Sequence, residues 1–296
     1  MRSKRPPYNR SGSRRYGQRP QHRNKIDSSQ SFQKTLDINC NLGQGFGIYQ
    51  NKFEEKVLPY VTSVNIACGM HTGDPLTIIR AVDLAKENDL SVGALIGYND
   101  KTGNGEREMY LEVDELKAMV LYQISALHGI LHTRGLDIRH VRPHGFLYKQ
   151  VYSDLLIAET VAKAIAEFSR WITLVGLSGH ILLEACSNAN IKPGQEVQID
   201  KRYRKDGTIL PTSKYGDKTK DMLTESAQKA RQLIQTGTMT CEDKTKLRIN
   251  VDTIHVPSDS EECIELARTV RAMVINPKPI HLDKYDKYFA NASVLN

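Results

Sequence analysis

The fold is decided by the stretch DINCNLGQGFG, residues 37–47. We expect it to begin as a buried strand over 36–39 and to continue as a loop with three glycines in five residues. Short polar side chains beside a glycine-rich loop are typical of the edge where α/β proteins bind ligands. Three later stretches have the same form, at 65–74, 93–100 and 142–148.

Strand-like and helix-like segments alternate along the rest of the chain. This alternation is typical of a parallel α/β barrel or a doubly wound sheet, and we favour the barrel because polar loops follow several different strands. We expect a tail over 1–33, the barrel over 34–275 and an extension over 276–296. Buried parallel strands are predicted at 36–39, 61–66, 90–94, 138–142, 172–175, 197–199 and 249–256. Helices are predicted after an N-cap at Asp74 and over 113–131, 153–168, 179–188, 222–235 and 260–274.

The net charge of +7 is a property of the tail alone. Residues 1–26 hold nine Lys and Arg residues and no acid, which leaves 32 of the 41 basic residues against all 34 acidic ones. This segment has too few apolar residues for burial to offset the entropy lost on ordering, so we expect it to be disordered when free. Three interpretations stay open: a solvated tail, an organelle-targeting segment, and an RNA contact. Candidate RNA-binding residues are Arg2, Arg5, Arg10, Arg14, Arg15 and Arg19.

The cysteine spacing and the hydropathy of the chain indicate its cellular compartment. The five cysteines are widely spaced without a C-x-x-C pair, which indicates free thiols in a reducing compartment. No apolar run approaches the roughly 18 residues of a membrane span. We expect an intracellular protein, in the cytoplasm foremost, with the mitochondrion and the nucleus as alternatives.

Five polar side chains at the predicted strand ends are candidates for one catalytic pocket: Asp37, Asn39, His71, Asp74 and His144. An Asp and two His can hold a divalent metal, or act as a general base with an orienting carboxylate. No spacing matches a local metal signature, so we assign no metal ligand. The alternative for Asp74 is helix capping, and for either histidine a structural hydrogen bond. A polar loop over 201–220 is typical of a lid or binding loop.

The ordered motifs resemble one known family. The stretch 37–47, the run LPYVTSVNIACGMHTGDP over 58–75 and the run PHGFLY over 143–148 resemble the LamB/YcsF family of 5-oxoprolinase A subunits. Shorter matches at 97–98, 107–109, 122–124, 175–177, 203–207 and 252–254 extend this collinear resemblance over about 36–275. It implies a seven-stranded β/α barrel similar to polysaccharide deacetylases. It also implies ATP-dependent opening of the lactam 5-oxoproline to glutamate, with separate B and C subunits.

The departures from the family pattern fall on polar positions. Asn41 and Gln44 stand where the family has carboxylates, and Leu95 and Pro257 stand where it has histidines. Amides cannot accept a proton near neutral pH, and Leu and Pro can neither bind a metal nor transfer a proton. We therefore expect impaired or lost catalysis. Candidate substrate-binding residues are Asn65, Gly69, Tyr98, Arg142, Asp200 and Asp259.

Three functions follow from these observations. The first is a 5-oxoprolinase-type hydrolase with weakened chemistry that uses ATP through its partner subunits. The second is a non-catalytic component of a larger or RNA-containing assembly, joined to it by the basic tail. The third is a metal-dependent deacetylase-like hydrolase, which rests on fold analogy and on Asp37, His71 and His144.

Overall fold

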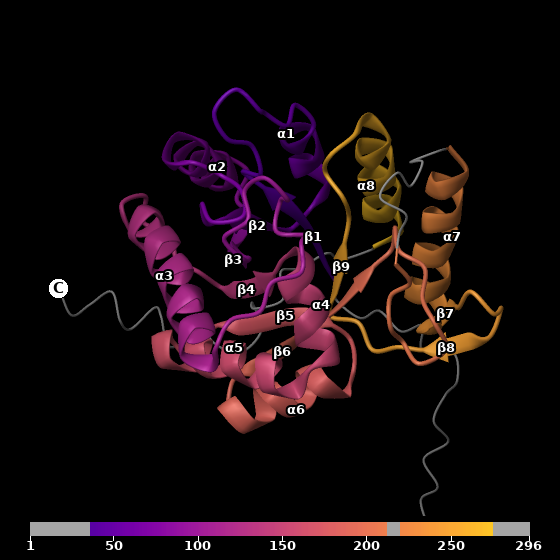
Figure 1. Ribbon diagram of the computed structural model, residues 1–296. Helices are drawn as coiled ribbons and strands as arrows, with labels where there is room; N and C mark the ends of the chain where they lie inside the picture. Colours follow the sequence, from indigo (N-terminus) through magenta and orange to yellow (C-terminus); the bar gives the residue numbers. More distant parts are fainter. Residues whose placement is uncertain (1–35, 212–219, 275–296) are drawn as a thin grey trace, which may run out of the picture. The chain divides into compact units, whose positions relative to one another are not determined.

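A closed barrel of seven parallel strands forms the centre of the computed structural model, which describes residues 36–211 and 220–274 (Figure 1). The strand order is β1-β2-β3-β4-β5-β6-β9, and β9 closes the barrel between β6 and β1. The predicted seven-stranded parallel barrel is thereby confirmed. The strands are β1 (Asp37–Leu42), β2 (Ser63–Ala67), β3 (Ser91–Ile96), β4 (His140–Pro143), β5 (Thr173–Leu177), β6 (Lys192–Gln198) and β9 (Thr253–His255).

Parts of the chain lie outside the described residues. These parts hold the tail predicted over 1–33 with its six candidate RNA-binding arginines, the extension predicted over 276–296, and residues 212–219 of the predicted lid. Within the described ranges, no helix has both the length and the apolar composition needed to cross a membrane. All five cysteines fall in these ranges, and each is a buried free thiol.

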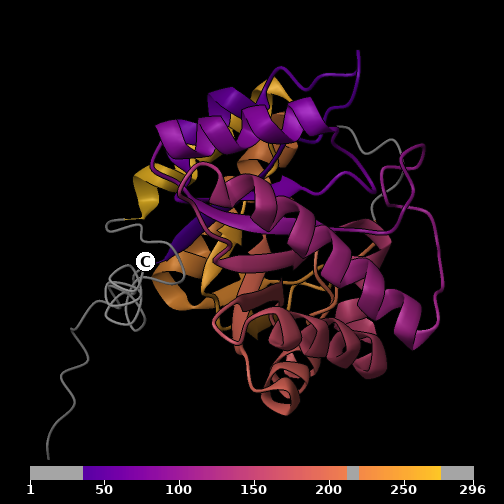
Figure 2. The ribbon, with the colours of Figure 1, turned by 90° about the vertical axis from the view of Figure 1, so that its left-hand side faces the viewer.

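Helices surround the barrel and cover its outer surface (Figure 1). The longest is α3, whose buried residues follow the predicted stripe from Leu116 to Leu131; it lies on the side that faces the viewer in Figure 2. The helices are α1 (Glu54–Val57) with a 3₁₀ turn (Leu58–Tyr60), α2 (Pro75–Glu87), α3 (Val113–His132), α4 (Gly145–Ser153), α5 (Leu155–Phe168), α6 (His180–Ala189), α7 (Lys220–Thr236) and α8 (Glu261–Met273).

Besides α1 and its 3₁₀ turn, two other parts of the fold were not predicted. One is the antiparallel pair β7 (Thr238–Thr240) and β8 (Lys246–Arg248), which is too short and polar to produce a periodic pattern. The other is α4, which begins directly after His144. Its first residue, Gly145, has φ +57°, and a Cβ there would lie 2.2 Å from the carbonyl oxygen of Gly105. A side chain would therefore clash where this helix starts.

The barrel interior is polar, which corrects the prediction for β1. The strand runs to Leu42 and does not end at Asn39. Its alternate residues Ile38, Cys40 and Leu42 join the apolar core beneath the helices. Asp37 and Asn39 lie on the opposite face, where Asn39 bonds to a side chain of the non-neighbouring strand β6. A bond between strands that are not neighbours must cross the interior, so these polar residues point inward.

Candidate functional site

Asn39 is the centre of a hydrogen-bond network inside the barrel. Its Nδ2 donates to Thr253 Oγ1 at 2.7 Å and to Glu196 Oε1 at 3.2 Å. This orientation leaves Asn39 Oδ1 as the acceptor, and Asn65 Nδ2 and His255 Nδ1 both donate to it at 2.8 Å. His255 must therefore carry its proton on Nδ1, so its Nε2 is the basic nitrogen.

The network continues through Asn65 to a second buried histidine. Asn65 uses its amide nitrogen toward Asn39, so its Oδ1 accepts from His140 Nε2 at 2.7 Å. Burial, with a contribution from Arg142, lowers the pKa of His140 to about 3. Burial also lowers the pKa of His255 well below its usual value, and Arg142, Lys201 and His144 act in the same direction. Both imidazoles are therefore neutral at pH 7.

A buried ion pair completes the interior. Glu196 accepts from Arg142 through Nε at 2.8 and 3.1 Å and through Nη2 at 2.8 Å, and from the hydroxyl of Tyr148 at 2.9 Å. Burial by itself lowers the pKa of Arg142, but the charge and hydrogen bonds of Glu196, together with Tyr148 and Asp200, outweigh it and the pKa is raised. Arg142, a predicted substrate-binding residue, therefore has its guanidinium already held by a carboxylate.

Asp37 lies at the amino-terminal end of the barrel. It is the first residue of β1, and its carboxylate accepts from Thr62 Oγ1 at 2.6 Å, from Ser63 Oγ at 2.9 Å and from Thr253. Burial raises its pKa to about 6, against the effect of these hydroxyls. The histidines at 71 and 144 follow the carboxyl ends of β2 and β4. The structure therefore separates Asp37 from the two histidines with which it was grouped.

His71 and His144 do lie together, at the carboxyl edge of the barrel. Their rings stack with centroids 4.5 Å apart. His144 Nε2 donates to the carbonyl oxygen of Asn104 at 2.9 Å, and a carboxylate oxygen of Glu106 lies 3.7 Å away. Burial and then Arg142 lower the pKa of His144 to about 4, although the Asn104 carbonyl opposes this. Burial and the neighbouring His144 lower the pKa of His71 well below its usual value.

The ring nitrogens of His71 are unsatisfied. Neither Nδ1 nor Nε2 has a hydrogen-bond partner in the described part of the chain, although the residue is 0% exposed. The ring is also confined, because a Cβ at Gly97 would lie 2.7 Å from Nδ1 and a Cβ at Gly105 would lie 2.9 Å from its Cβ. A buried neutral imidazole holds one donor and one acceptor, and leaving either unpaired costs about 1–3 kcal/mol. This pair of groups is the clearest indication of a ligand.

Several other predicted site residues have local structural contacts. Asp74 caps α2, accepting from Thr77 N at 2.8 Å, and it also accepts from Gly47 N at 2.7 Å, as the capping interpretation predicted. The hydroxyl of Tyr98 donates to Gln150 Oε1 within the core. Gly69 has φ +88° in the turn after β2, where its amide donates to Thr72 O.

The two remaining candidate carboxylates lie beyond the ends of the last two barrel strands. Asp200 follows β6 and pairs with Lys201 Nζ at 2.9 Å. Asp259 is exposed just before α8, and its Oδ1 accepts from Cys263 Sγ at 3.4 Å.

The four positions that depart from the family pattern differ in their surroundings. Asn41 lies in the interior network, where its Oδ1 accepts from Asn65 Nδ2 at 3.3 Å. Leu95 is 0% exposed and pairs in register with Arg142 on the neighbouring strand. Gln44 lies in the loop after β1, and Pro257 is partly buried two residues after β9. At least two of the four substitutions therefore lie beside the polar interior.

The buried polar residues that were not predicted include Glu54, His140, Glu196 and His255. Glu54 accepts from the amides of Gly43 at 2.9 Å and Gln44 at 3.1 Å, so it holds the glycine-rich loop, and burial raises its pKa to about 7. One sequence signal was available, because polar residues alternate with apolar ones along β1, β2 and β9. Among the described residues, no three His, Cys, Asp or Glu side chains are grouped so that they can hold a metal ion.

Comparison with known proteins identifies the family of this chain. The chain is 36% identical over 239 residues to the 5-oxoprolinase A subunit of Pyrococcus abyssi, covering 81% of this chain and 93% of that protein. It is 37% identical over 239 residues to the 5-oxoprolinase A subunit of Symbiobacterium thermophilum, covering 81% and 91%. The crystal structure of the lactam utilization protein from Thermus thermophilus superposes with a TM-score of 0.75 at 33% identity, covering 81% of this chain and 96% of that one. Residues 36–286 match the LamB/YcsF family, and the chain belongs to that family.

Proposed function

We propose that this protein is a 5-oxoprolinase A-type subunit that binds a lactam at the His71–His144 pair and has impaired or lost catalysis. The observation that carries the proposal is the pair of unpartnered ring nitrogens on His71, 0% exposed at the carboxyl edge of the barrel. A lactam offers an N–H donor and a C=O acceptor side by side. A neutral imidazole can match one of these with either ring nitrogen.

The neighbouring groups suit the uncharged amide of a lactam ring. His144 donates through Nε2 to Asn104, so its Nδ1 is the nitrogen that can accept a proton. Its pKa of about 4 leaves it neutral at pH 7 and makes it a weak general base. Glu106, whose side chain is 64% exposed, lies 3.7 Å from this ring. This set can bind and orient a lactam. In the ring opening, water adds to the carbonyl carbon, the C–N bond breaks and the ring nitrogen takes up a proton.

Impaired catalysis is supported by the surroundings of Asn41 and Leu95. Asn41 bonds to Asn65 as an amide and supplies no anionic charge. Leu95, beside Arg142, supplies no imidazole. General acid–base groups contribute on the order of 100-fold or more each, so the loss of two or more lowers the rate severely.

Partner subunits and ATP belong to the same proposal. The relatives are named as A subunits of 5-oxoprolinase, so we assign partners of the B and C types to this protein. ATP then acts through those partners, since opening a resonance-stabilised amide needs an activated carbonyl.

The test combines binding with turnover. Calorimetry should detect 5-oxoproline binding to the full-length protein, and His144→Ala should weaken it. With ATP and the B and C subunits of a bacterial 5-oxoprolinase, glutamate release should be slow or absent. The double variant Asn41→Asp, Leu95→His, which restores two family residues, should be faster by about 100-fold.

Two results would contradict the proposal. Failure to bind 5-oxoproline, alone or with the B and C subunits present, would remove the lactam assignment. Turnover by the unaltered protein as fast as that of a bacterial A subunit would remove the impairment.

A further inference from the structure

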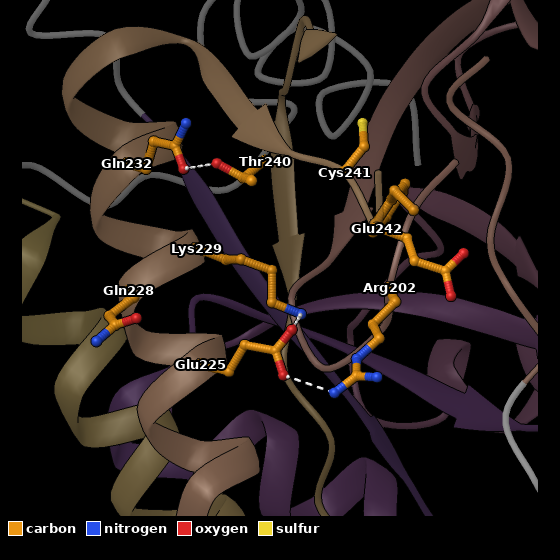
Figure 3. A pocket seen from close by; sticks show the side chains of 9 residues that line it. Arg202, Glu225, Gln228, Lys229, Gln232, Thr240, Cys241 and Glu242 are labelled. Carbon is orange, nitrogen blue, oxygen red and sulfur yellow. Dashed lines mark hydrogen bonds and ion pairs between the residues drawn. The ribbon is translucent and has the colours of Figure 1, made fainter. Parts of the chain in front are cut away.

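A second cavity, of about 340 Å³, lies between α7, the β7 end of the β7–β8 pair and the segment that follows β6 (Figure 3). None of its lining residues belongs to a strand of the barrel. The cavity is therefore distinct from the His71–His144 site. Part of its wall comes from the loop that was predicted to bind a ligand.

Four charged side chains line the cavity: Arg202, Glu225, Lys229 and Glu242. Glu225 lies between the two cations, with Oε2 3.2 Å from Arg202 Nη2 and Oε1 3.7 Å from Lys229 Nζ. Figure 3 shows these three side chains pointing toward one another. Two positive and two negative groups make the lining neutral as a whole, with charges of both signs exposed to any occupant.

Lys229 is the most buried of these four residues. The residue is only 7% exposed, and its Nζ donates to the carbonyl oxygen of Lys201 at 2.7 Å. An ammonium has three donors, and its 3.7 Å ion pair with Glu225 is too long for a hydrogen bond. Burial lowers the pKa of Lys229, although Glu225 opposes this. A buried cation with an unused donor at a cavity wall favours an anionic group in that cavity.

A negatively charged side chain lies at the exposed rim of the cavity. Glu242 and Gln228 line the cavity, and neither side chain bonds to another described residue. A carboxylate there can accept from a ligand ammonium, while the Gln228 amide can donate or accept. The cavity thus offers two cations, Lys229 and Arg202, which share the Glu225 carboxylate between them, and a separate anionic group at Glu242.

We propose that this cavity binds a free α-amino acid as its zwitterion, with L-glutamate as the representative of the class. The ligand carboxylate pairs with Lys229 and Arg202, and its ammonium pairs with Glu242. The volume lies at the lower end of the range for small-molecule sites. 5-Oxoproline has an uncharged amide N–H in place of the ammonium, so it can donate a hydrogen bond to Glu242 but cannot form an ion pair with it. The cavity therefore distinguishes a ring-opened amino acid from a lactam.

Calorimetry with L-glutamate and the full-length protein tests this assignment. Lys229→Met and Arg202→Gln should each weaken binding by about tenfold or more, since each removes a charged hydrogen bond. Arg202 has a side chain that is 66% exposed, so its variant tests the site even if Lys229→Met unfolds. The matched control is Arg231→Met, on the exposed surface of α7 and outside the lining, which should bind as the wild type does.

Two further probes separate this site from the lactam site. Glutarate, which lacks the ammonium, should bind at least tenfold more weakly than L-glutamate. The affinity for 5-oxoproline should be unchanged in Arg202→Gln, so failure of the lactam proposal and failure of this one give different results. The assignment is overturned if L-glutamate does not bind at up to about 10 mM, if both variants bind it normally, or if glutarate binds equally well.

Discussion

Removing the positive charge of Arg142 should destabilise the barrel more than any surface substitution. In Arg142→Met the Glu196 carboxylate loses three contacts of 2.8–3.1 Å and keeps only Tyr148 and Asn39 as partners. Both side chains of the pair are almost fully buried, at 4% and 0% exposure. Breaking such a pair from one side costs about 3–5 kcal/mol. For a domain of this size, that loss lowers the melting temperature by about 6–20 °C.

The assay is thermal unfolding of four proteins followed by circular dichroism: the wild type, Arg142→Met, Glu196→Gln and the double variant. Each single change leaves one buried charge unpaired, whereas the double change leaves none. The double variant should therefore lose less than the two single losses combined. The control is Arg134→Met, which breaks a partly exposed pair with Asp83 and should cost no more than about 1 kcal/mol.

If Arg142→Met melts as Arg134→Met does, the buried pair does not stabilise the barrel. If the single losses add without coupling, the two charges do not compensate each other.

Three further predictions address the histidines and the α2 cap. Asp74→Ala should lower the free energy of unfolding by about 1 kcal/mol, measured by urea unfolding, because the α2 cap is lost. If the variant also lost affinity for 5-oxoproline, Asp74 would have to be a binding residue and not only a cap. Gly97→Ala should cost about 1–3 kcal/mol and weaken 5-oxoproline binding, because its Cβ would lie 2.7 Å from His71 Nδ1. Gly129→Ala, with no atom within 4 Å and a position inside α3, should instead gain about 0.5–1 kcal/mol. The pKa of His140 is about 3 in the folded protein and about 6.5 in the unfolded chain. The unfolded chain therefore takes up a proton as the pH falls below 6.5 while the folded protein does not, so the stability that is present above pH 6.5 is lost on acidification. The wild type should therefore lose about 2 kcal/mol more than His140→Asn between pH 7 and pH 5 in urea unfolding, and equal losses would contradict this account.

The architecture could be predicted from local patterns because the outward-facing strand residues are mostly apolar and each long helix has one apolar stripe. The five helices predicted with both bounds agree with α3, α5, α6, α7 and α8 to within two residues at each end. The two short β7 and β8 strands and α4 lacked such a pattern. Their positions follow from contacts with distant segments, which a window of sequence does not contain.

The site was harder to predict, for a reason visible in β1. Asp37, Asn39 and Asn41 alternate with Ile38 and Cys40, and polar residues at alternate positions suggested that the strand had ended. In a barrel with a polar interior, the same alternation continues through the strand. Asp37 was therefore assigned to the wrong end of the barrel.

Side-chain contacts between residues that are distant in sequence could not be predicted either. Arg142 and Glu196 are 54 residues apart, and neither spacing nor composition joins them. His140 and His255 fell within the strands predicted over 138–142 and 249–256, but the sequence did not show that their side chains face the barrel interior. Their burial becomes apparent only once the barrel is closed.

The bond from Asn39 to Thr253 joins residues 214 positions apart and has a consequence for the order of folding. β1 leaves the ribosome early, and its inward side chains can bond to β2 soon afterwards. Their bonds to Thr253 and His255 form only when β9 has been synthesised, and forming them requires the closure of a very long loop. A partly synthesised barrel exposes amides, hydroxyls and carboxylates along its open inner face, in place of the aliphatic surface of a Val/Ile/Leu-filled barrel. Such an intermediate has little apolar surface there to drive aggregation. The polar interior therefore favours a soluble nascent chain and a late, concerted closure.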